Sequence, residues 1–595
     1  MNKTIINRLE ALRTSMKREG IAAYIIPSAD AHLSEYTPER WTGRTWISGF
    51  TGSAGTMLVT LSGAYLWTDS RYFIQAADEL QGTTIELMKM GQPDVPSIED
   101  FISTELSSGS IVAADGACIS YAEAKDTADS LANFGINYRL DTDLLNEVWT
   151  DRPNIPSKEL FLQPSEYSGQ TAADRIKLVR EKLRTKGANA TLITMLCELA
   201  WVFNIRGYDV EYNPVAVGFG YISQEEAVLF VLPEKLTDEV RSSLLNNGVR
   251  LAHYSDIGAF VSALPTTTKL YIDPRRLTHR LYTYIPSHCK LIQGVSILTS
   301  LKAVKTPTEL EGVRRAMVRD GVSLTRFFIW LENLLNSGGS ISEYNLGLKL
   351  NEFRRKGGHF YGDSFGTIAG YLGHGAIVHY KAEPTTSYEI KSEGVLLLDS
   401  GGQYFDGTTD ITRTLALSPP SDQLRTDYTL VLKGHIAIAT AQFPEGTRGS
   451  QIDILARKAL WDKGMNYGHG TGHGVGYFLN VHEGPQNIRT EVNPTPLEIG
   501  MITSNEPGLY RANEYGIRIE NLIVTELKAE TPFGRFLGFE TVTLCYLDNS
   551  LVDKTLLSAD EIAWYNSYQE RVYQSLSPHL TETEAAWLRA KTEAI

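Results

Sequence analysis

Two stretches in the first half of the chain share one pattern of apolar and polar positions. Residues 8–26 (RLEALRTSMKREGIAAYII) and 175–193 (RIKLVREKLRTKGANATLI) align without gaps, and Gly20 of the first matches Gly187 of the second. In each stretch apolar side chains recur at helical spacing before the glycine, and an apolar run typical of a strand follows it. The repeat predicts two related α/β domains, and we expect the proline-containing segment 151–164 to link them.

A third unit is predicted after the two repeats. Thr306 and Glu309 form a capping box around a proline, and the apolar spacing that follows predicts a helix to about Asn336. Ser340 and Glu343 have the spacing of a second capping box and predict that another helix begins there. Beyond this helix the pattern changes to strands and loops, with further helices expected near residues 421–441 and 449–463.

The last segment of the chain, residues 551–595, is predicted to be helical. It carries two capping boxes, Ser558 with Glu561 and Thr581 with Glu584. Its aromatic residues are Trp564, Tyr565, Tyr568, Tyr573 and Trp587. We expect these rings to pack on the third domain, and a contact with a second subunit is the alternative.

Composition excludes several classes of function. The chain has 595 residues, enough for several domains, and a formal net charge of −14. It contains no cluster of basic residues and no motif that reads nucleic acid, so nucleic acid is not an expected partner. No apolar run is long enough to span a bilayer, and residues 1–20 lack the apolar core of a signal peptide. The four cysteines form no paired motif and are expected in the core, which fits a reducing cytoplasm.

Two aspartates mark one segment of the third unit. Residues 395–414 (VLLLDSGGQYFDGTTDITRT) predict a hairpin whose two strands carry Asp399 and Asp410. For these carboxylates to face each other, the turn must centre near Tyr404 and Phe405, which implies a wide loop or a bulge. Such a pair suits a site for hard cations or a pair of acid and base groups. The alternative is that both aspartates only stabilise the turn and bind nothing.

Seven of the twelve histidines lie between residues 359 and 482. The stretch 467–485 (YGHGTGHGVGYFLNVHEGP) holds His469 and His473 among so many glycines that a regular helix is disfavoured. We therefore expect a loop or an irregular strand in which the backbone comes close to a partner. His482 follows on a short predicted strand.

Two further segments supply carboxylates. Glu506 precedes a proline, which favours an extended backbone at the end of a strand. Arg518 and Glu520 alternate along a predicted strand and should share one face, although an isolated pair of this kind is commonly a cross-strand ion pair. Taken together, two aspartates, one histidine and two glutamates can hold two divalent cations. Carboxylate-dominated ligation with one imidazole favours Mn²⁺ over structural zinc, and two such metals can activate a shared water.

These segments closely resemble the motifs of the cytosolic aminopeptidase P (Xaa-Pro aminopeptidase) family. That family shares the pita-bread fold with prolidase, methionine aminopeptidase and creatinase. The resemblance is carried by DSGGQYFDGTTDITRT, HGTGHGVGYFLNVHEGP, NEPGLY and GIRIEN, and outside the third unit by WTDSRYFIQAA (67–77) and NIRGYDVEYNPV (204–215). It implies an α/β (α+β) architecture made of two creatinase-like N-terminal α/β domains, a pita-bread catalytic domain and a helical C-terminal extension. The expected boundaries are 1–157, 158–304, 305–550 and 551–595.

The resemblance also implies a role for each site residue. The metal ligands would be Asp399, Asp410, His473, Glu506 and Glu520, with Asp410 and Glu520 bridging the two metals. The catalytic residues would be His379, His482 and Glu506, with Glu506 as the general base. The substrate-binding residues would be His379, His469, His482 and Arg518. The cofactors implied are two divalent ions per subunit, Mn²⁺ first, with Zn²⁺ or Co²⁺ as alternatives.

The activity implied is removal of the N-terminal residue from peptides with proline at the second position, by a hydroxide that bridges the two metals. The family further implies a homodimer located in the cytoplasm. A prolidase is the nearest rival, because it uses the same ligands but cleaves only dipeptides. The doubled N-terminal domains and the closeness of the motifs favour the aminopeptidase. A peptide-binding pseudoenzyme on the same fold is a second rival, and the intact ligand set argues against it.

Overall fold

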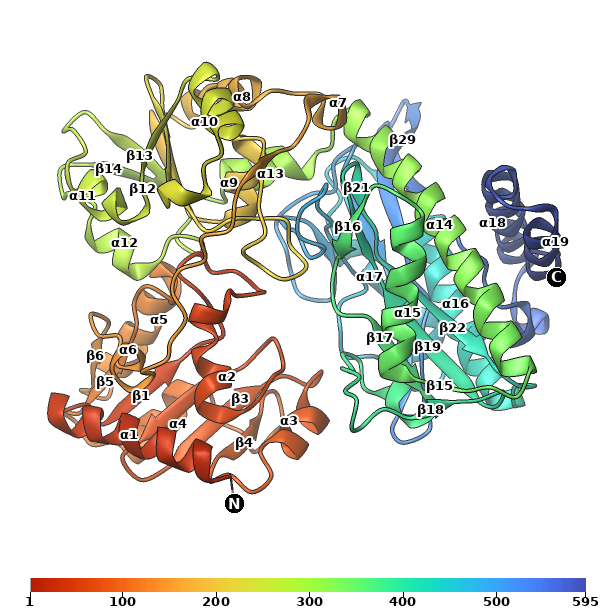
Figure 1. Ribbon diagram of the computed structural model, residues 1–595, viewed down its shortest axis with the longest axis horizontal. Helices are drawn as coiled ribbons and strands as arrows, with labels where there is room; N and C mark the ends of the chain where they lie inside the picture. Colours follow the sequence, from red (N-terminus) through yellow and green to blue (C-terminus); the bar gives the residue numbers. More distant parts are fainter. Residues whose placement is uncertain (1) are drawn as a thin grey trace. The chain divides into compact units, whose positions relative to one another are not determined.

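The computed structural model describes residues 2–595, which fall into two compact units. Unit 1 contains the chain up to Pro164 together with Gln170–Leu301. Unit 2 contains Ser165–Gly169 and Lys302–Ile595. Figure 1 shows unit 1 from red to yellow-green and unit 2 from green to blue.

Unit 1 contains two six-stranded mixed sheets with the same topology. The strand order is β4-β3-β2-β1-β5-β6 in the first sheet and β12-β11-β10-β8-β13-β14 in the second. Each pair of neighbouring strands runs in the same relative direction in both sheets. On one side of the central strand two antiparallel pairs are followed by a parallel edge pair, and on the other side both pairs are parallel. This correspondence confirms the two related α/β domains that the repeat predicts. The strands are β1 (Ala23–Ile26), β2 (Thr56–Thr60), β3 (Ala64–Thr68), β4 (Glu86–Lys89), β5 (Ile111–Ala114), β6 (Asn137–Arg139), β8 (Ala190–Ile193), β10 (Phe219–Ser223), β11 (Ala227–Val231), β12 (Val249–His253), β13 (Lys269–Ile272) and β14 (Lys290–Gln293).

The repeated helix, glycine and strand open each of these sheets. Helix α1 (Lys3–Glu19) ends at Gly20, whose φ is 67°, and α8 (Ala172–Thr185) is followed by Gly187, whose φ is 72°. Glycine takes this backbone conformation without the steric cost that other residues meet, so each glycine stops its helix and turns the chain into the central strand. The other helices of unit 1 are α2 (Gly43–Ser48), α3 (Phe73–Glu79), α4 (Ile98–Glu105), α5 (Tyr121–Ala132), α6 (Leu145–Val148), α9 (Leu196–Val202), α10 (Asp238–Asn246), α11 (Ile257–Ser262), α12 (His279–Thr283) and α13 (Ile297–Ala303).

Unit 2 is built on a three-stranded antiparallel sheet, β17-β19-β22, flanked by long helices. Helix α14 (Pro307–Asn336) packs against α15 (Glu343–Lys356), and α16 (Asp422–Ala439) packs against α17 (Gly449–Trp461). Figure 1 shows α14 and α15 side by side along the sheet. The capping box and the extent of α14 confirm the prediction for the first helix of this unit.

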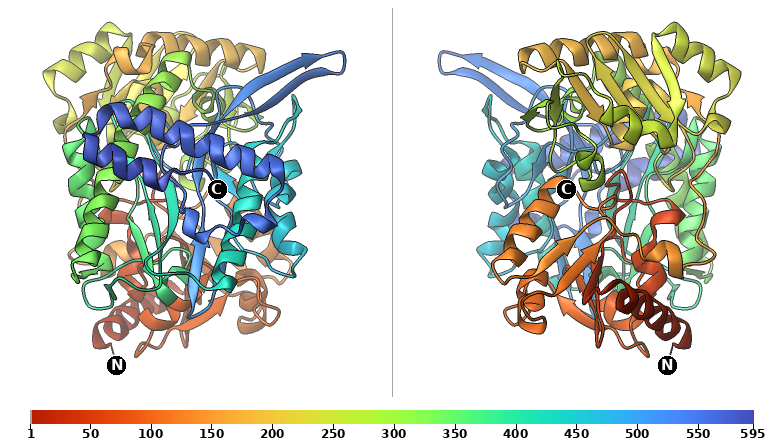
Figure 2. Two further views of the ribbon diagram at one scale, coloured as in Figure 1. Left: turned by 90° about the vertical axis from the view of Figure 1, so that its right-hand side faces the viewer. Right: turned by 90° about the vertical axis from the view of Figure 1, so that its left-hand side faces the viewer.

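The remaining strands of unit 2 are short, apart from a long hairpin near its end. Strands β29 and β30 form this hairpin, which Figure 2 shows projecting from the unit. In chain order, with those of the three-stranded sheet included, the strands of unit 2 are β15 (Ile341–Ser342), β16 (Phe360–Asp363), β17 (Ile368–Tyr371), β18 (Glu389–Ile390), β19 (Val395–Ser400), β20 (Gly402–Tyr404), β21 (Gly407–Thr408), β22 (Ile411–Ala416), β23 (Phe443–Pro444), β24 (Gly472–His473), β25 (Asn487–Ile488), β26 (Ile502–Asn505), β27 (Gly508–Arg511), β28 (Tyr515–Arg518), β29 (Asn521–Thr531) and β30 (Gly534–Thr541).

One predicted helix cap is wrong. Helix α15 begins after Ser342, whose hydroxyl accepts a hydrogen bond from the N–H of Asn345, so Ser340 is not the cap. The reason is a long-range strand pair, because β15 pairs with β18 and keeps the chain extended up to Ser342. Glu343 is buried instead, and it accepts hydrogen bonds from the N–H groups of Tyr371 (2.8 Å) and Tyr388 (2.7 Å).

The chain ends in two helices, α18 (Ala559–Leu576) and α19 (Glu582–Lys591), and both have the predicted capping boxes. Tyr565 and Tyr568 are buried in the main hydrophobic core of unit 2, and the other aromatic residues of the tail pack against that core. This confirms that the tail packs on the third domain. All four cysteines are buried and none forms a disulfide, as predicted. Within residues 2–595 no helix has the length and apolar character needed to cross a membrane.

Candidate metal centre

Strands β19 and β22 bring the two predicted aspartates together. The strands pair antiparallel with Asp399 opposite Thr412. Asp410 precedes Thr412 by two residues, and side chains two apart on an extended chain point to the same side. The two carboxylates are therefore diagonal neighbours on one face of the hairpin.

The turn of this hairpin lies one residue from the predicted place. Tyr404 of β20 pairs with Gly407 of β21, so the turn residues are Phe405 and Asp406 and the predicted centre at Tyr404 and Phe405 is wrong. The prediction assumed directly opposed carboxylates, which the diagonal arrangement does not need. Asp406 is bound by Arg319 of α14, at 2.7 Å, and takes no part in the site.

The glycine-rich stretch and the end of β26 supply the next two residues. His473 Nε2 lies 3.4 Å from Asp410 Oδ2 and 3.6 Å from Glu506 Oε1. The hydroxyl of Ser504 accepts from the N–H of His473 at 2.9 Å and donates to Glu506 Oε1 at 3.2 Å. A Cβ atom on Gly472 would lie 1.9 Å from the Ser504 carbonyl oxygen, so only glycine permits this approach. Glu506 follows β26 directly, as predicted.

Arg518 and Glu520 meet the hairpin through a residue that sequence reasoning missed. Thr412 Oγ1 accepts from Arg518 Nε at 3.2 Å and donates to Glu520 Oε2 at 2.8 Å. The two residues do not share one regular strand, because the chain passes from β28, paired with β27, to β29, paired with β26. The alternation of Asp410 and Thr412 in the sequence was the signal that could have identified this threonine.

One of the predicted substrate-binding histidines lies beside His473. The ring of His482 packs edge-on against that of His473, with 4.4 Å between the centroids. His482 lies in a loop and not on the predicted short strand, because the chain turns back so that the N–H of Glu483 donates to the Gly474 carbonyl at 2.7 Å.

The other two histidines lie on the side of the site where Arg518 is bound. His469 Nε2 lies 2.8 Å from the Tyr510 hydroxyl, which accepts from Arg518 Nη1 at 2.7 Å. His379 lies in the loop after β17, next to Val378, whose carbonyl accepts from Arg518 Nη2 at 3.4 Å. Tyr510 is a further residue of the site that the sequence did not single out.

Burial of several carboxylates together controls the electrostatics of the site. Burial raises the pKa of Glu520 well above its ordinary value, and the charge of Asp410 raises it further. Burial also raises the pKa of Glu506 to about 7. The pKa of Asp399 is raised by burial as well, although the Arg518 guanidinium, 2.6 Å away, opposes that shift. The cluster therefore needs additional positive charge to keep its carboxylates ionised.

His473 responds to the same charges in the opposite sense. Burial lowers its pKa, but the hydrogen bond to Asp410 and the charge of Glu506 outweigh burial and raise the pKa to about 9. The imidazole thus lies where negative charge attracts a cation, which can be a proton or a metal ion.

The donor set fits a divalent cation. Asp410, His473 and Glu520 each offer one ligand atom, and these three atoms lie within 4.8 Å of one another. Within residues 2–595 no hydrogen-bond partner reaches the buried Oδ1 of Asp399, while Oδ2 binds Arg518. Carboxylate oxygens with one imidazole are ligands that Mn²⁺ and similar ions accept.

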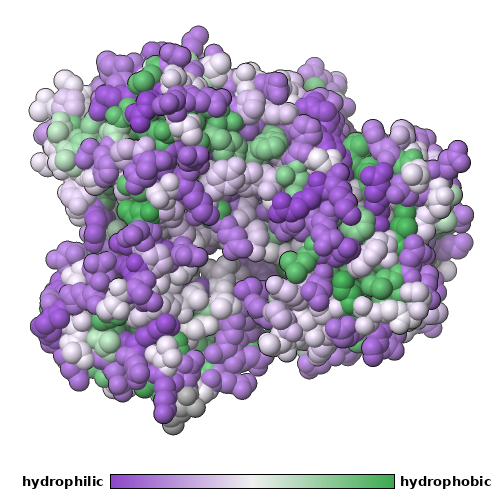
Figure 3. Space-filling model, in the orientation of Figure 1, coloured by the Kyte–Doolittle hydropathy of each residue, from purple (hydrophilic) through white to green (hydrophobic). Residues whose placement is uncertain are grey.

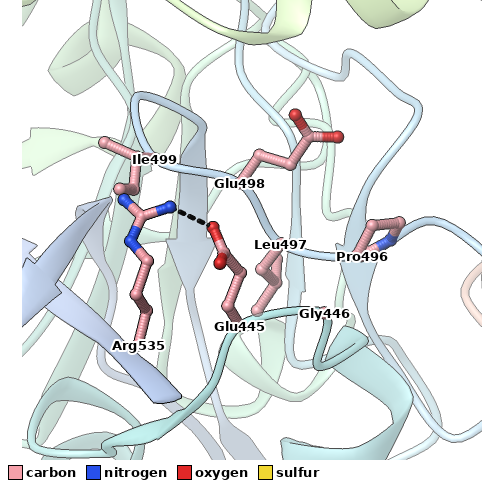
Figure 4. A pocket seen from close by; sticks show the side chains of 7 residues that line it. All are labelled: Glu445, Gly446, Pro496, Leu497, Glu498, Ile499 and Arg535. Carbon is pink, nitrogen blue, oxygen red and sulfur yellow. Dashed lines mark hydrogen bonds and ion pairs between the residues drawn. The ribbon is translucent and has the colours of Figure 1, made fainter. Parts of the chain in front are cut away.

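A surface pocket elsewhere in unit 2 is separate from this centre. Its volume is about 400 Å³, and Figure 4 shows Glu445 paired with Arg535 at 2.6 Å in its wall. The other lining residues include Pro496, Leu497, Glu498 and Ile499. None of the predicted site residues lines this pocket.

Four segments of the chain match described families. Residues 8–135 and residues 151–309 each match a creatinase/prolidase N-terminal domain. Residues 311–526 match metallopeptidase family M24, and residues 535–595 match the C-terminal region of peptidase M24. The order of these matches agrees with the order of the sheets and helices described above.

Relatives match over nearly the whole length. A probable Xaa-Pro aminopeptidase P of Laccaria bicolor is 42% identical over 98% of this chain and 92% of its own. Aminopeptidase P2 of Arabidopsis thaliana is 40% identical over 97% of this chain and 86% of its own. The chain belongs to the aminopeptidase P family. The family predicted from the motifs is thereby confirmed.

Solved structures of the aminopeptidase P family and of a dipeptidase agree with this fold. X-prolyl aminopeptidase from Caenorhabditis elegans, described as a cytosolic enzyme with a di-nuclear active site, has a TM-score of 0.95 at 34% identity, covering 100% of both chains. The Xaa-Pro dipeptidase from Bacillus anthracis has a TM-score of 0.51 at 24% identity, covering 63% of this chain and 98% of its own, and shows the fold alone. The fold class is confirmed as two creatinase-type α/β domains followed by an M24 pita-bread domain. The domain boundaries and the role of each site residue stay predictions.

The metal centre predicts a stabilising effect of Mn²⁺. We expect Mn²⁺ to raise the unfolding temperature of metal-stripped protein, because a cation that binds the folded state adds about 2.7 kcal/mol when its free concentration is about 100 times Kd. Glu520→Gln should abolish this rise, measured by differential scanning calorimetry.

A second buried carboxylate provides the control. Asp427 binds Arg511 (2.6 Å) and the Tyr515 hydroxyl (2.8 Å) and lies outside the cluster. Asp427→Asn should lower the unfolding temperature yet keep the Mn²⁺-dependent rise. An undiminished rise in Glu520→Gln would show that Glu520 is not a ligand.

Proposed function

We propose that this member of the aminopeptidase P family is a metal-dependent aminopeptidase that removes the N-terminal residue from peptides with proline at the second position. The observation that carries the proposal is the meeting of Asp410, His473 and Glu520 within reach of one cation. Family membership over the full length supports the choice of substrate.

We propose five ligands for two divalent cations, with Asp410 and Glu520 shared between them. The ligands are Asp399, Asp410, His473, Glu506 and Glu520. The excess of carboxylates favours Mn²⁺, and Zn²⁺ or Co²⁺ are alternatives. Two cations held there would lower the pKa of a shared water towards neutral and stabilise an oxyanion.

The other residues of the site have separate proposed roles in the reaction. Glu506, oriented by the hydroxyl of Ser504, takes the proton of the attacking water as general base. His379 and His482 donate to the oxygen of the scissile carbonyl, where charge develops. His469 and Arg518 bind the substrate. The proline nitrogen carries no proton as a tertiary amide and must receive one before it leaves, and the proton that Glu506 has taken from the water is the one it receives.

Domain content argues against the prolidase alternative. The dipeptidase fold accounts for less than two thirds of this chain, whereas the aminopeptidase P relatives match both N-terminal domains. The complete set of carboxylate and imidazole donors argues against a binding protein without activity. Substrate length is the property that separates these alternatives.

Peptide length provides the direct test. With Mn²⁺ restored to metal-stripped protein, Arg-Pro-Pro should release arginine, and a metal-free sample should not. Release is measured by chromatography of the free amino acid, with Gly-Pro offered in parallel. Cleavage of Gly-Pro alone would identify a dipeptidase, and no cleavage of either peptide with metal bound would contradict the proposed activity.

His379 has a proposed role in the transition state and none in metal binding. His379→Ala should lower kcat by about 100-fold, the typical cost of losing one donor to an oxyanion. Metal content, measured by mass spectrometry, should not change. His579→Ala, which alters an exposed histidine of the tail, is the control and should keep full activity. Loss of metal from His379→Ala would show that its role is wrongly assigned.

We further propose that the protein is a cytoplasmic homodimer. Ile454, Leu455 and Trp461 of α17 are exposed, with 44% of Trp461 accessible, and exposed apolar residues of this kind are typical of contacts between subunits. On the face drawn in Figure 3, hydrophobic residues form small patches separated by hydrophilic ones. Light scattering should give about twice 66.1 kDa, whereas 66.1 kDa at every concentration would exclude the dimer.

A further inference from the structure

A buried arginine lies directly behind the proposed ligand Glu520. Arg413 follows Thr412 on β22 and is 2% exposed. Its Nη1 donates to the main-chain carbonyl of Glu520 at 2.7 Å and to that of Thr412 at 2.9 Å. Its Nε donates to the Tyr546 carbonyl at 2.9 Å. The guanidinium therefore joins the main chain of the ligand to the segment that follows β30.

The C-terminal helix α18 completes the surroundings of this arginine. Nη2 of Arg413 donates to the Tyr568 hydroxyl at 2.9 Å, to Asn521 Oδ1 at 2.8 Å and to the Cys545 carbonyl at 2.9 Å. The Tyr568 hydroxyl in turn lies 2.9 Å from the Cys545 carbonyl and can donate its proton there. Both the donor and the acceptor capacity of this hydroxyl are thus used within the core.

Asn521 extends the network to the second glutamate of the site. Its Nδ2 lies 3.0 Å from His435 Nε2, and His435 Nδ1 lies 3.1 Å from the main-chain carbonyl of Asn505. Asn505 immediately precedes Glu506, and Asn505 pairs with Asn521 between β26 and β29. A shift of Asn521 would therefore move both glutamates.

Simple packing does not explain a tyrosine at position 568. Trp564 stacks on the Tyr568 ring with 5.4 Å between the ring centroids, and a phenylalanine ring would fill the same space. The hydroxyl instead bridges the buried guanidinium and the main chain, because it lies 2.9 Å from Arg413 Nη2 and can donate its own proton to the Cys545 carbonyl at 2.9 Å. Figure 2 shows α18 and α19 lying on the outside of unit 2, and Arg413 joins Tyr568 of α18 to the main chain of Glu520.

We propose that Tyr568 is a positioning residue for the metal centre, which it supports through Arg413 and Asn521 by fixing the main chain at Glu520. The inference rests on the proposed assignment of Glu520 as a metal ligand. It gives the C-terminal extension a part in the chemistry although none of its residues enters the site. Groups that hydrogen-bond to a metal ligand typically change metal affinity or activity by about 10- to 100-fold, and Tyr568 lies one contact further out, behind Arg413.

The test compares two tyrosines of the same helix. Tyr565 lies one turn from Tyr568 and is also fully buried, but its hydroxyl donates to Asn549 Oδ1 at 2.7 Å and does not reach Arg413. Tyr568→Phe and Tyr565→Phe each remove one buried hydroxyl from α18. Mn²⁺ binding is titrated by the electron paramagnetic resonance signal of free Mn²⁺, and kcat and KM are measured with Arg-Pro-Pro.

We expect Tyr568→Phe to bind Mn²⁺ about tenfold more weakly and to lose kcat with little change in KM. Tyr565→Phe should remain within about twofold of the wild type in Mn²⁺ affinity and in kcat. We expect this even if Tyr565→Phe lowers the unfolding temperature as much as Tyr568→Phe does. Equal Mn²⁺ affinity in the two variants would overturn the inference while leaving the proposed function intact. A wild-type chain that neither binds Mn²⁺ nor cleaves the peptide would overturn both.

A milder variant keeps the test decisive should Tyr568→Phe fail to fold. Trp564 is half-buried, and its ring stacks on that of Tyr568 and packs edge-on against that of His435, so it supports two members of the network behind Glu520. Trp564→Leu should weaken Mn²⁺ binding by a few-fold relative to Tyr565→Phe. Unchanged affinity in Trp564→Leu would then count against the proposed role.

Discussion

The structure of unit 2 depends on one electrostatic constraint, the burial of four carboxylates in a single site. Asp399, Asp410, Glu506 and Glu520 raise the electrostatic cost of one another's charge, and burial adds to that cost. Such groups persist in a fold when hydrogen bonds and opposite charges compensate for the lost water. Arg518 supplies one permanent positive charge, and the remaining compensation is the physical reason for cation binding.

The fold meets this constraint by placing the carboxylates at the ends of paired strands. Asp399 is the penultimate residue of β19, Glu506 follows β26 and Glu520 precedes β29, so the sheet register determines their spacing. Hydroxyl groups of Thr412 and Ser504 then orient individual oxygens. The backbone thus sets where each carboxylate lies, and neighbouring side chains set how its oxygens are oriented.

Local sequence signals were sufficient where structure depends on near neighbours. The repeat around Gly20 and Gly187, the capping box at Thr306 and the extended backbone before Pro507 all follow from short-range chemistry. The Ser340 cap failed because a strand pair formed with a segment almost fifty residues away. The predicted position of the hairpin turn was wrong because diagonal and direct pairing of two carboxylates give the same sequence pattern.

Contacts between distant segments were beyond such reasoning. Arg413 and Tyr568 are 155 residues apart, and nothing in either local sequence marks them as partners. The tail was expected to pack on the third domain, and it does, but only the folded chain shows which hydroxyl reaches the buried guanidinium. Thr412 is the intermediate case, because its alternation with Asp410 was visible although its two hydrogen bonds were not.

The exposure of the proposed ligands differs from one side of the site to the other. The Glu520 residue is 1% exposed and the Asp410 side chain 5%, whereas the His473 and Glu506 side chains are 22% and 19% exposed. His482 packs on His473 at this more open side, where a histidine can reach a scissile carbonyl. Asp410 and Glu520, the two carboxylates proposed to bridge, are consequently the least exposed of the four, and Glu520 is held from behind by Thr412 and Arg413. A substrate bound at the proposed centre would therefore meet His473 and His482 first, while Glu520 lies against the part of the core that α18 closes.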